Sequence, residues 1–259
     1  MRKRVVVTIL AVVAVTALLA SVLSVATKGE EVNALSKVEY PAVAAHRCGA
    51  ALYAECTLEG AKAVNAEDPD VILEFDVQQL KDGAFVVIHD DAIDRVAAGG
   101  KTGKVSDMTV AQWEQLRIKD PTGGDPAPAT FLSEMLDEFG DTDTVMMIEL
   151  KAPDVNKFIE TLWPYRGQVI AQSFEDKVTS VLARSGLNTI QLVSGTSTPT
   201  IVDGVDAVGM HMDRLNTTTA KRITDTGVKL WTWGANLKSN DPAYLDLGVD
   251  GFLVNDPTR

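Results

Sequence analysis

The sequence predicts an α/β fold: a TIM-type (β/α)8 barrel with an added β-hairpin arm. Three observations support this fold class. The chain has 259 residues, a common size for such a barrel built as one domain. Short apolar runs alternate along the chain with amphipathic segments. These runs are almost continuously apolar, as parallel strands buried on both faces require.

Eight apolar runs after residue 41 are the predicted barrel strands. They are residues 42–46, 71–76, 145–150, 169–174, 190–194, 207–212, 229–233 and 251–255. Amphipathic stretches typical of helices lie between them, at residues 57–67, 131–140, 155–163 and 217–227. The weakest unit follows the fifth or sixth strand, because "TSTPTIVDG" is too short and too rich in Pro and Gly for a good helix.

One segment interrupts this alternation. Residues 75–90 contain two apolar runs joined by a turn at Lys81-Asp82-Gly83, which predicts an antiparallel hairpin arm over about residues 77–90. The arm would bring Asp76 roughly opposite His89. The polar, glycine-rich stretch 97–130 is predicted to be a long connection with one short helix near "VAQWEQL".

The N-terminus predicts export. "MRKR" precedes 22 residues without a charge, Val5 to Ala26. This run is longer than the roughly 7–15 residues of a signal-peptide core and long enough for a helix to span a bilayer, yet "SVA" resembles a cleavage site. Residues 1–27 are therefore either a cleaved signal peptide or an uncleaved membrane anchor. In both cases residues 28–40 are a linker and residues 41–259 are the folded domain. The domain is then either secreted or held at the outer face of the cytoplasmic membrane.

The charge of the exported part disfavours nucleic-acid binding. Without Arg2, Lys3 and Arg4 it has 21 Lys and Arg against 36 Asp and Glu, a net charge of −15. Such a surface repels phosphate backbones. A small phosphate-containing substrate would need a metal ion or local cations to offset this field.

Polar residues gather where the predicted strands end, which is where a barrel of this type forms its active site. They are His46, Arg47, Glu74, Asp76, His89, Glu149, Lys151, Ser173, His211, Trp231, Trp233, Asn255 and Asp256. Glu74 and Asp76 share one face of a strand because they are two residues apart. With Glu149 they form a site of oxygen ligands, which suits Mg²⁺ or Ca²⁺ better than zinc.

The remaining charged groups suggest acid–base chemistry on a phosphodiester. His46 and His89 on opposite sides of a bound phosphodiester would act as base and acid. Arg47 and Lys151 suit the phosphoryl oxygens. His211 is either a substrate contact or a packed core histidine. Trp231 and Trp233 would wall the substrate pocket, unless one of them is core.

The pattern as a whole resembles the glycerophosphodiester phosphodiesterase family of the PLC-like phosphodiesterase superfamily. The motifs that carry the resemblance span about residues 42–257 and occur in the family's order. They are His46-Arg47, "AECTLEGA", "LEFDVQQLKDGAFVVIHDDAIDR", "TGKVSDMT", "IELK", "QSF", "LWTW" and "GVDGFLVNDP".

The resemblance implies a barrel enzyme that hydrolyses glycerophosphodiesters to an alcohol and sn-glycerol 3-phosphate with a divalent cation, Mg²⁺ or Ca²⁺. Metal ligands would match Glu74, Asp76 and Glu149, and the acid and base would match His46 and His89. Substrate-binding positions would match Arg47, Lys151, Glu55, His211 and Trp231. Attack by the substrate's own glycerol hydroxyl and attack by water both remain open.

The chain departs from the family pattern in three places. Cys48 replaces the usual Gly after His-Arg, Cys56 replaces the usual Asn, and Trp233-Gly234 replaces the usual Val-Asn. Two cysteines at the ends of one loop in an exported protein predict a Cys48–Cys56 disulfide. Metal binding by the two thiols is the alternative.

Two other functions are compatible with the same barrel. One is a lipid-directed phosphodiesterase of the sphingomyelinase D type, which would take lysolipids. The other is a non-catalytic binding barrel, whose mark would be a missing metal ligand or histidine. The sequence lacks none of them.

Overall fold

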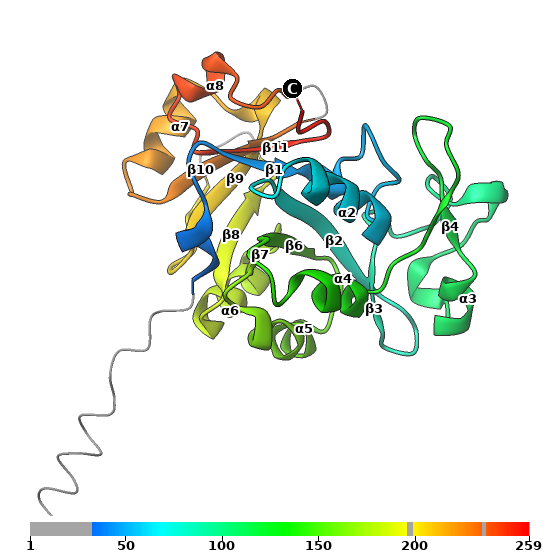
Figure 1. Ribbon diagram of the computed structural model, residues 1–259. Helices are drawn as coiled ribbons and strands as arrows, with labels where there is room; N and C mark the ends of the chain where they lie inside the picture. The colour runs from blue at the N-terminus through cyan, green and yellow to red at the C-terminus, as the bar shows by residue number, and fades with distance from the viewer. Residues whose placement is uncertain (1–32, 196–198, 235–236, 259) are drawn as a thin grey trace, which may run out of the picture. The chain divides into compact units, whose positions relative to one another are not determined.

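The computed structural model describes residues 33–195, 199–234 and 237–258 (Figure 1). The predicted export segment, residues 1–27, and the first residues of the predicted linker lie outside these ranges. No helix within the described ranges is both long and apolar enough to cross a membrane.

The predicted barrel is confirmed: eight parallel strands pair side by side and close into a ring. Around the ring the strands are β1 (Ala42–Ala45), β2 (Ile72–Gln79), β6 (Met146–Leu150), β7 (Val169–Ser173), β8 (Asn188–Val193), β9 (Ala207–His211), β10 (Lys229–Trp233) and β11 (Gly251–Val254). The ring closes because β1 pairs with β2 on one side and with β11 on the other. Each strand matches one of the eight apolar runs to within a few residues.

Helices cover the outside of the barrel. They are α2 (Leu58–Glu67), α4 (Leu132–Phe139), α5 (Val155–Leu162), α6 (Asp176–Ser185), α7 (Thr217–Thr224) and the short α8 (Pro242–Leu245). Several begin at a side chain that caps the first turn. Thr57 Oγ1 accepts from the Gly60 amide at the start of α2, and Asp154 Oδ1 accepts from the Lys157 amide at the start of α5. The described residues between β8 and β9 form no helix, in agreement with their Pro- and Gly-rich sequence.

The predicted hairpin is also confirmed. β3 (Phe85–Val87) pairs antiparallel with the end of β2, with Val77 opposite Val87. The Ile88 amide donates to the Asp76 carbonyl oxygen at 2.9 Å, so the chain returns toward the barrel rim at His89. Gly83 permits the turn because its φ of +86° lies in the left-handed region that favours glycine.

The long connection after the hairpin packs as a small lobe beside the barrel (Figure 1). It contains η3 (Ala98–Gly100), η4 (Val105–Asp107), α3 (Val110–Glu114) and the short pair β4 (Arg117–Ile118) and β5 (Ala127–Pro128). Trp113 and Leu116 are fully buried at its centre. The Trp113 indole donates to the Thr130 carbonyl oxygen, which ties the lobe to the segment before α4.

The predicted linker is wrong for residues 33–40, which belong to the folded domain. Residues Ala34–Lys37 form the 3-10 helix η1. Ala34 is fully buried in the core that also contains Met147 and Trp231, and its amide donates to Asn188 Oδ1 at 2.9 Å. The sequence did not predict this contact, because a single small alanine within a polar segment makes it.

Candidate active site

A cavity of about 410 Å³ opens at the carboxyl ends of the barrel strands. The residues lining it are His46, Arg47, Ala50, Glu55, Glu74, His89, Arg95, Glu149, Gln172, Phe174, Leu192, His211, Trp233, Gly234, Leu253 and Asn255. Nine of the candidate site residues are among them, which is the convergence expected of strand ends in a barrel. Asp76 and Lys151 lie directly beside them, in contact with Glu149.

A strained loop positions the first of these residues. Arg47 and Cys48, after β1, have φ angles of 53° and 58°, and Cys56 has 56°. Non-glycine residues with such φ angles cost about 1–3 kcal/mol each and are frequent at functional sites. The loop is held by the Cys56 amide, which donates to the Arg47 carbonyl oxygen at 2.9 Å. The Arg47 amide donates to Glu74 Oε2 at 2.8 Å.

Three buried carboxylates form the centre of the site. Glu74, Asp76 and Glu149 each offer an oxygen, and these oxygens lie within 4.8 Å of one another. Asp76 and Glu149 are register partners on β2 and β6, and Glu74 shares their face of the sheet. Such a cluster of buried like charges is unstable without a cation or protons.

The pKa values of these groups follow from that crowding. Burial, and next the charge of Asp76, raise the pKa of Glu74 to about 8 and that of Glu149 to about 9. Burial alone would raise the pKa of Asp76 too, but the nearby Lys151 ammonium holds it below its usual value. Two carboxyls therefore retain protons at neutral pH unless a cation replaces them. This set of oxygen ligands fits a hard divalent cation.

Two further side chains hold the carboxylates in place. The Lys151 ammonium lies 2.9 Å from Asp76 Oδ1 and 3.7 Å from Glu149 Oε1, and it donates to the His89 carbonyl oxygen at 3.2 Å. Gln172 Nε2 donates to Glu74 Oε1 at 2.8 Å. Sequence reasoning missed Gln172, although it stands in "QSF" on β7, and its register with Glu149 puts it beside the cluster.

The two predicted histidines have different partners. His46 Nδ1 donates to Asn255 Oδ1 at 2.6 Å, which leaves Nε2 without a proton in the neutral ring. Burial, and then the charge of Arg47, lower the pKa of His46 to about 4. His89 Nδ1 lies 2.7 Å from Asp90 Oδ1. His46 is thus kept neutral, whereas His89 faces a carboxylate.

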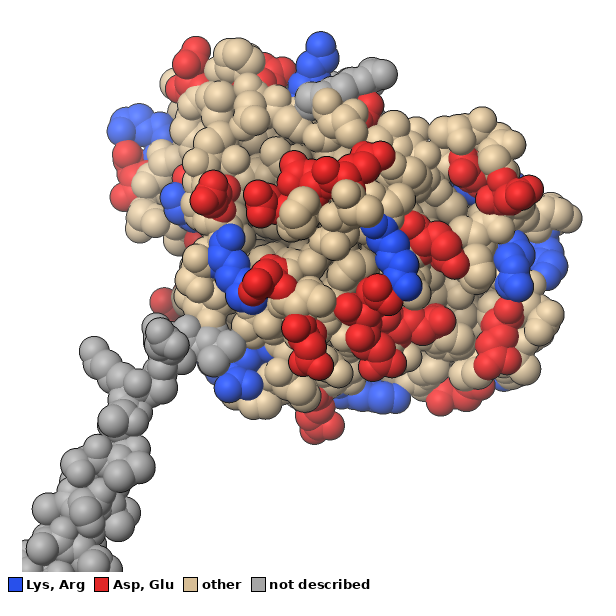
Figure 2. All heavy atoms as spheres, in the orientation of Figure 1, with Lys and Arg blue, Asp and Glu red and all other residues tan. Residues whose placement is uncertain are grey.

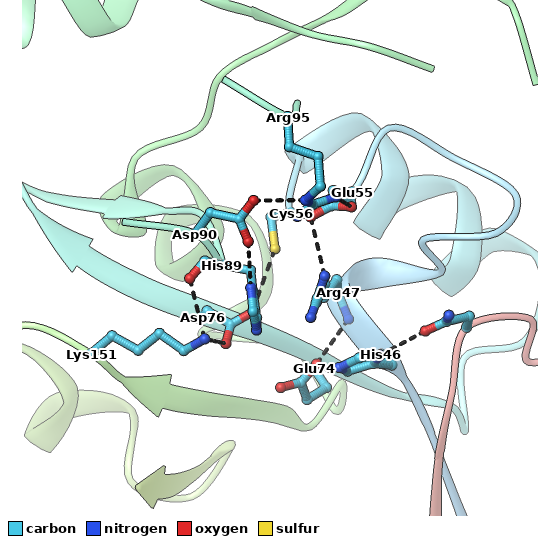
Figure 3. Close-up of polar contacts among 11 residues, drawn as sticks. His46, Arg47, Glu55, Cys56, Glu74, Asp76, His89, Asp90, Arg95 and Lys151 are labelled. Atoms are coloured by element: carbon cyan, nitrogen blue, oxygen red, sulfur yellow. Dashed lines mark hydrogen bonds and ion pairs between the residues drawn. The ribbon is translucent and has the colours of Figure 1, made fainter. Parts of the chain in front are cut away.

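Asp90 belongs to a network that the sequence did not reveal (Figure 3). Arg95 donates to both Glu55 carboxylate oxygens and, through Nε, to Asp90 Oδ2, each at 2.6 Å. Burial would raise the pKa of Asp90, but hydrogen bonds from Arg95 and His89 lower it to about 2. Glu55 also lies 3.6 Å from Arg47. Both missed residues, Asp90 and Arg95, stand in the motif "HDDAIDR".

The Arg47 guanidinium is not fully hydrogen-bonded within the described residues. Its Nε atom is buried and has no hydrogen-bond partner among the described residues. Its Nη1 atom is 3.6 Å from Glu55 Oε1, too far for a hydrogen bond. The guanidinium lines the cavity next to the carboxylates, so an anion such as a phosphoryl group would satisfy it.

The predicted disulfide is not present: Cys48 and Cys56 are both free thiols and both are buried. Each sulfur faces a different residue of β2. Cys48 Sγ lies 3.7 Å from the Glu74 carbonyl oxygen, and Cys56 Sγ lies 3.9 Å from Asp76 Oδ2. Burial raises the pKa of both thiols, and neighbouring carboxylates raise it further, so they are unsuited as thiolate ligands.

Trp231 was wrongly predicted to contact substrate. It is completely buried inside the barrel, and Gly251 leaves room for it, since a Cβ there would lie 2.3 Å from its ring. Tyr40 packs against it edge-to-face, with ring centroids 6.4 Å apart. Trp233, two residues later and nearer the rim, lines the cavity together with His211.

Comparisons with known proteins identify the family to which the chain is related. A family model described as "Glycerophosphoryl diester phosphodiesterase family" matches residues 46–201. A Glycerophosphodiester phosphodiesterase of Bacillus subtilis (strain 168) is 30% identical over 269 residues, covering 90% of this chain and 88% of that protein. One from Caldanaerobacter subterraneus subsp. tengcongensis is 27% identical, covering 83% of this chain and 94% of its own.

Solved structures show the same fold. A phosphodiesterase of Oleispira antarctica in complex with the product sn-glycerol-3-phosphate superposes with a TM-score of 0.71 at 19% identity, covering 87% of this chain and 96% of that one. A glycerophosphodiester phosphodiesterase from Agrobacterium tumefaciens str. C58 gives a TM-score of 0.65 at 18% identity, with 83% and 97% covered.

Proposed function

Because the chain belongs to the glycerophosphoryl diester phosphodiesterase family, we propose that it hydrolyses glycerophosphodiesters to an alcohol and sn-glycerol 3-phosphate. One observation carries this proposal. Three buried carboxylates, two histidines with fixed Nδ1 atoms and an arginine with a buried unsatisfied Nε meet in or directly beside one cavity. These groups are suited to nucleophilic displacement at phosphorus with general acid–base catalysis.

Glu74, Asp76 and Glu149 would hold a divalent cation, Mg²⁺ or Ca²⁺. The bound cation would offset negative charge on the phosphoryl oxygens. Lys151 and Gln172 support this role, because they orient Asp76 and Glu74 from outside the cluster. Arg47 would bind a non-bridging phosphoryl oxygen, and Glu55 would keep its guanidinium in place.

His46 is the proposed general base. Its Nδ1 proton is held by Asn255 and its pKa is low, so Nε2 has a lone pair at neutral pH. It would take the proton from the nucleophile, either the glycerol hydroxyl of the substrate or water. His89 is the proposed general acid, because the ionised Asp90 orients its ring and compensates positive charge on it. It would protonate the oxygen of the departing alcohol.

The test is release of glycerol 3-phosphate from glycerophosphodiesters with and without cation. Activity is expected to vanish with a chelator and to return with Mg²⁺ or Ca²⁺. Glu74→Gln, Asp76→Asn and His46→Ala should each lower kcat at least about a hundredfold, the usual worth of one acid–base group. Trp163→Leu, an exposed change in η5 (Trp163–Tyr165), is the matched control. Full activity of the chelated enzyme would exclude the proposed metal role.

Lysophosphatidylcholine and sphingomyelin in the same assay test the lipid-directed alternative. We expect them to be hydrolysed far more slowly than glycerophosphodiesters, because the cavity of about 410 Å³ is small and mostly polar near the carboxylates. Faster turnover of either lipid would replace the proposed substrate class.

We also propose that the protein is exported. The proposal rests on the cationic start and the uncharged run from Val5 to Ala26. Fractionation of expressing cells should place the activity outside the cytoplasm. Mass spectrometry of the N-terminus then separates a secreted, cleaved form from an anchored one. Activity confined to the cytoplasm would contradict the proposal.

A further inference from the structure

Three aromatic side chains stand together at one side of the cavity: Phe174, His211 and Trp233. We call them the aromatic wall. The Trp233 ring is central, with ring centroids 5.6 Å from Phe174 and 5.7 Å from His211. The interplanar angles are 78° and 88°. Neighbouring rings are therefore nearly perpendicular, so the wall is angled rather than a flat stack.

The aromatic wall faces the carboxylates from the other part of the rim. The carboxylates and His46 come from β1, β2 and β6, whereas the wall comes from the ends of β7, β9 and β10. The same three rings also line an adjoining cavity of about 540 Å³, together with Ser194, Asp213 and Arg214. A phosphodiester bound at the carboxylates would thus reach the outer cavity by passing along the wall.

Contacts within the protein position the aromatic wall. Trp233 is in register with His211 on the neighbouring strand. The Asp213 amide donates to His211 Nδ1 at 3.2 Å, which fixes that ring. Phe174 remains 41% exposed, although it is a large apolar side chain. A fixed and exposed aromatic surface beside an active site is typical of a binding surface.

The chemistry of the wall favours a cationic ligand. Aromatic faces attract ammonium groups, and quaternary ammonium groups are typically bound by several angled rings. A sugar ring would instead stack flat on a single face. The Asp213 carboxylate, 78% exposed, lies 3.6 Å from His211 Nδ1 and lines the outer cavity. Arg214 lines the same cavity, and its positive charge disfavours binding of a cation there. Removing this charge should therefore strengthen the preference for a cationic ligand.

We propose that the aromatic wall binds the alcohol half of the substrate and selects alcohols that end in a quaternary ammonium group, with Asp213 supplying the counter-charge. This inference rests on the proposed function and names its substrate class. In this arrangement the phosphoryl group lies at Arg47 and the carboxylates, and the ammonium group lies against Trp233.

Two substrates of nearly equal shape isolate the effect of the ammonium charge on kcat/KM. One is glycerophosphocholine, and the other is the glycerol phosphodiester of 3,3-dimethylbutanol, in which carbon replaces nitrogen. The wild-type kcat/KM is expected to favour the choline ester by roughly 3-fold to 30-fold, the range of cation–aromatic contacts. Equal values for the two substrates, or a preference for the uncharged one, would overturn the inference.

Four variants test the residues through this ratio, which does not depend on how much enzyme is folded. Trp233→Leu should bring the ratio close to one, and Phe174→Leu should lower it less. Asp213→Asn should lower the ratio and Arg214→Gln should raise it, because they remove opposite charges. Trp163→Leu, at an exposed tryptophan that lines neither cavity, should leave it unchanged. An unchanged ratio in Trp233→Leu contradicts the inference.

A binding measurement separates this inference from the proposed function. Choline alone, titrated into the wild-type protein by calorimetry, should bind more tightly than to Trp233→Leu. If no glycerophosphodiester is hydrolysed with either cation, the proposed function fails, and the choline titration still decides the role of the wall. Equal binding by both proteins would exclude an ammonium site.

Discussion

The imidazole of His46 donates through Nδ1 to the side-chain oxygen of Asn255, 2.6 Å away and 209 residues later in the chain. The first barrel strand thus presents the proposed base, and the residue after the last strand fixes its tautomer. An amide in this position orients the ring, and its hydrogen bond raises the pKa of His46. Burial and the charge of Arg47 outweigh that contribution and hold the pKa low.

Replacing the amide by a carboxylate should change the pH dependence of the reaction. In Asn255→Asp the new charge stabilises the imidazolium, so the pKa of His46 rises from about 4. A general base must be neutral, so the acidic limb of the kcat/KM profile should move to higher pH. Activity at pH 5 should fall by more than activity at pH 8. Asn255→Ala, which adds no charge, is the control, and an unmoved limb in Asn255→Asp would argue against His46 as base.

The pairing of His89 with Asp90 predicts a dependence on the leaving group. Asp90→Asn keeps a hydrogen-bond acceptor but removes the charge that supports a protonated ring. On a poor leaving group such as an alkyl alcohol, kcat should fall about tenfold or more. On glycerol p-nitrophenyl phosphate, whose leaving group needs no protonation, the loss should nearly disappear. An equal loss on both substrates would mean that Asp90 serves the structure rather than His89.

The carboxylate cluster predicts that the stability of the chelated protein depends on pH more strongly than that of the cation-loaded protein. In the folded, metal-free protein the pKa values of Glu74 and Glu149 are about 8 and 9, above those of the unfolded chain. Folded protein therefore binds the extra protons, and this stability is complete below about pH 4.5 and is lost as pH rises through 8 and 9.

Thermal unfolding between pH 5 and pH 9 measures this effect. The chelated protein should lose several degrees of Tm as the pH rises, whereas saturating Mg²⁺ or Ca²⁺ should remove most of that loss. Glu149→Gln carries no charge at this position, so its chelated form should show a flatter profile. A chelated wild type that matched the variant would contradict the predicted pKa shifts.

The two cysteines should behave as buried thiols. An aromatic disulfide reagent is expected to detect no thiol in the native protein, because burial excludes the reagent and raises both pKa values. Denaturation without a reductant should release two thiols per chain. Finding none after denaturation would show that Cys48 and Cys56 are joined in the isolated protein.

Much of the fold could be predicted because burial leaves a direct mark on the sequence. Barrel strands are covered on both sides, so each appears as an apolar run with its polar residues at the end. The spacing of Glu74 and Asp76 similarly places both on one face of a strand. The hairpin followed from a single turn between two apolar runs.

The errors have physical causes as well. Trp231 and Trp233 point to the same side of β10, and only their depth in the barrel separates core from cavity. Cys48 and Cys56 suggested a bridge by their loop and compartment, but the direction of each side chain is set by backbone angles that spacing does not encode. Gln172 and Arg95 act on partners 98 and 40 residues away, which no local pattern records.

The pairing of β1 with β11 has a consequence for how the protein is made. A chain in which β11 has not yet been synthesised has an open sheet with two unpaired edges. Such a sheet is prone to association with other chains. Such a chain also lacks Asn255, the hydrogen-bond partner of the proposed base His46. A truncation that removes Gly251 to Asn255 would therefore produce an aggregating species rather than a weaker enzyme.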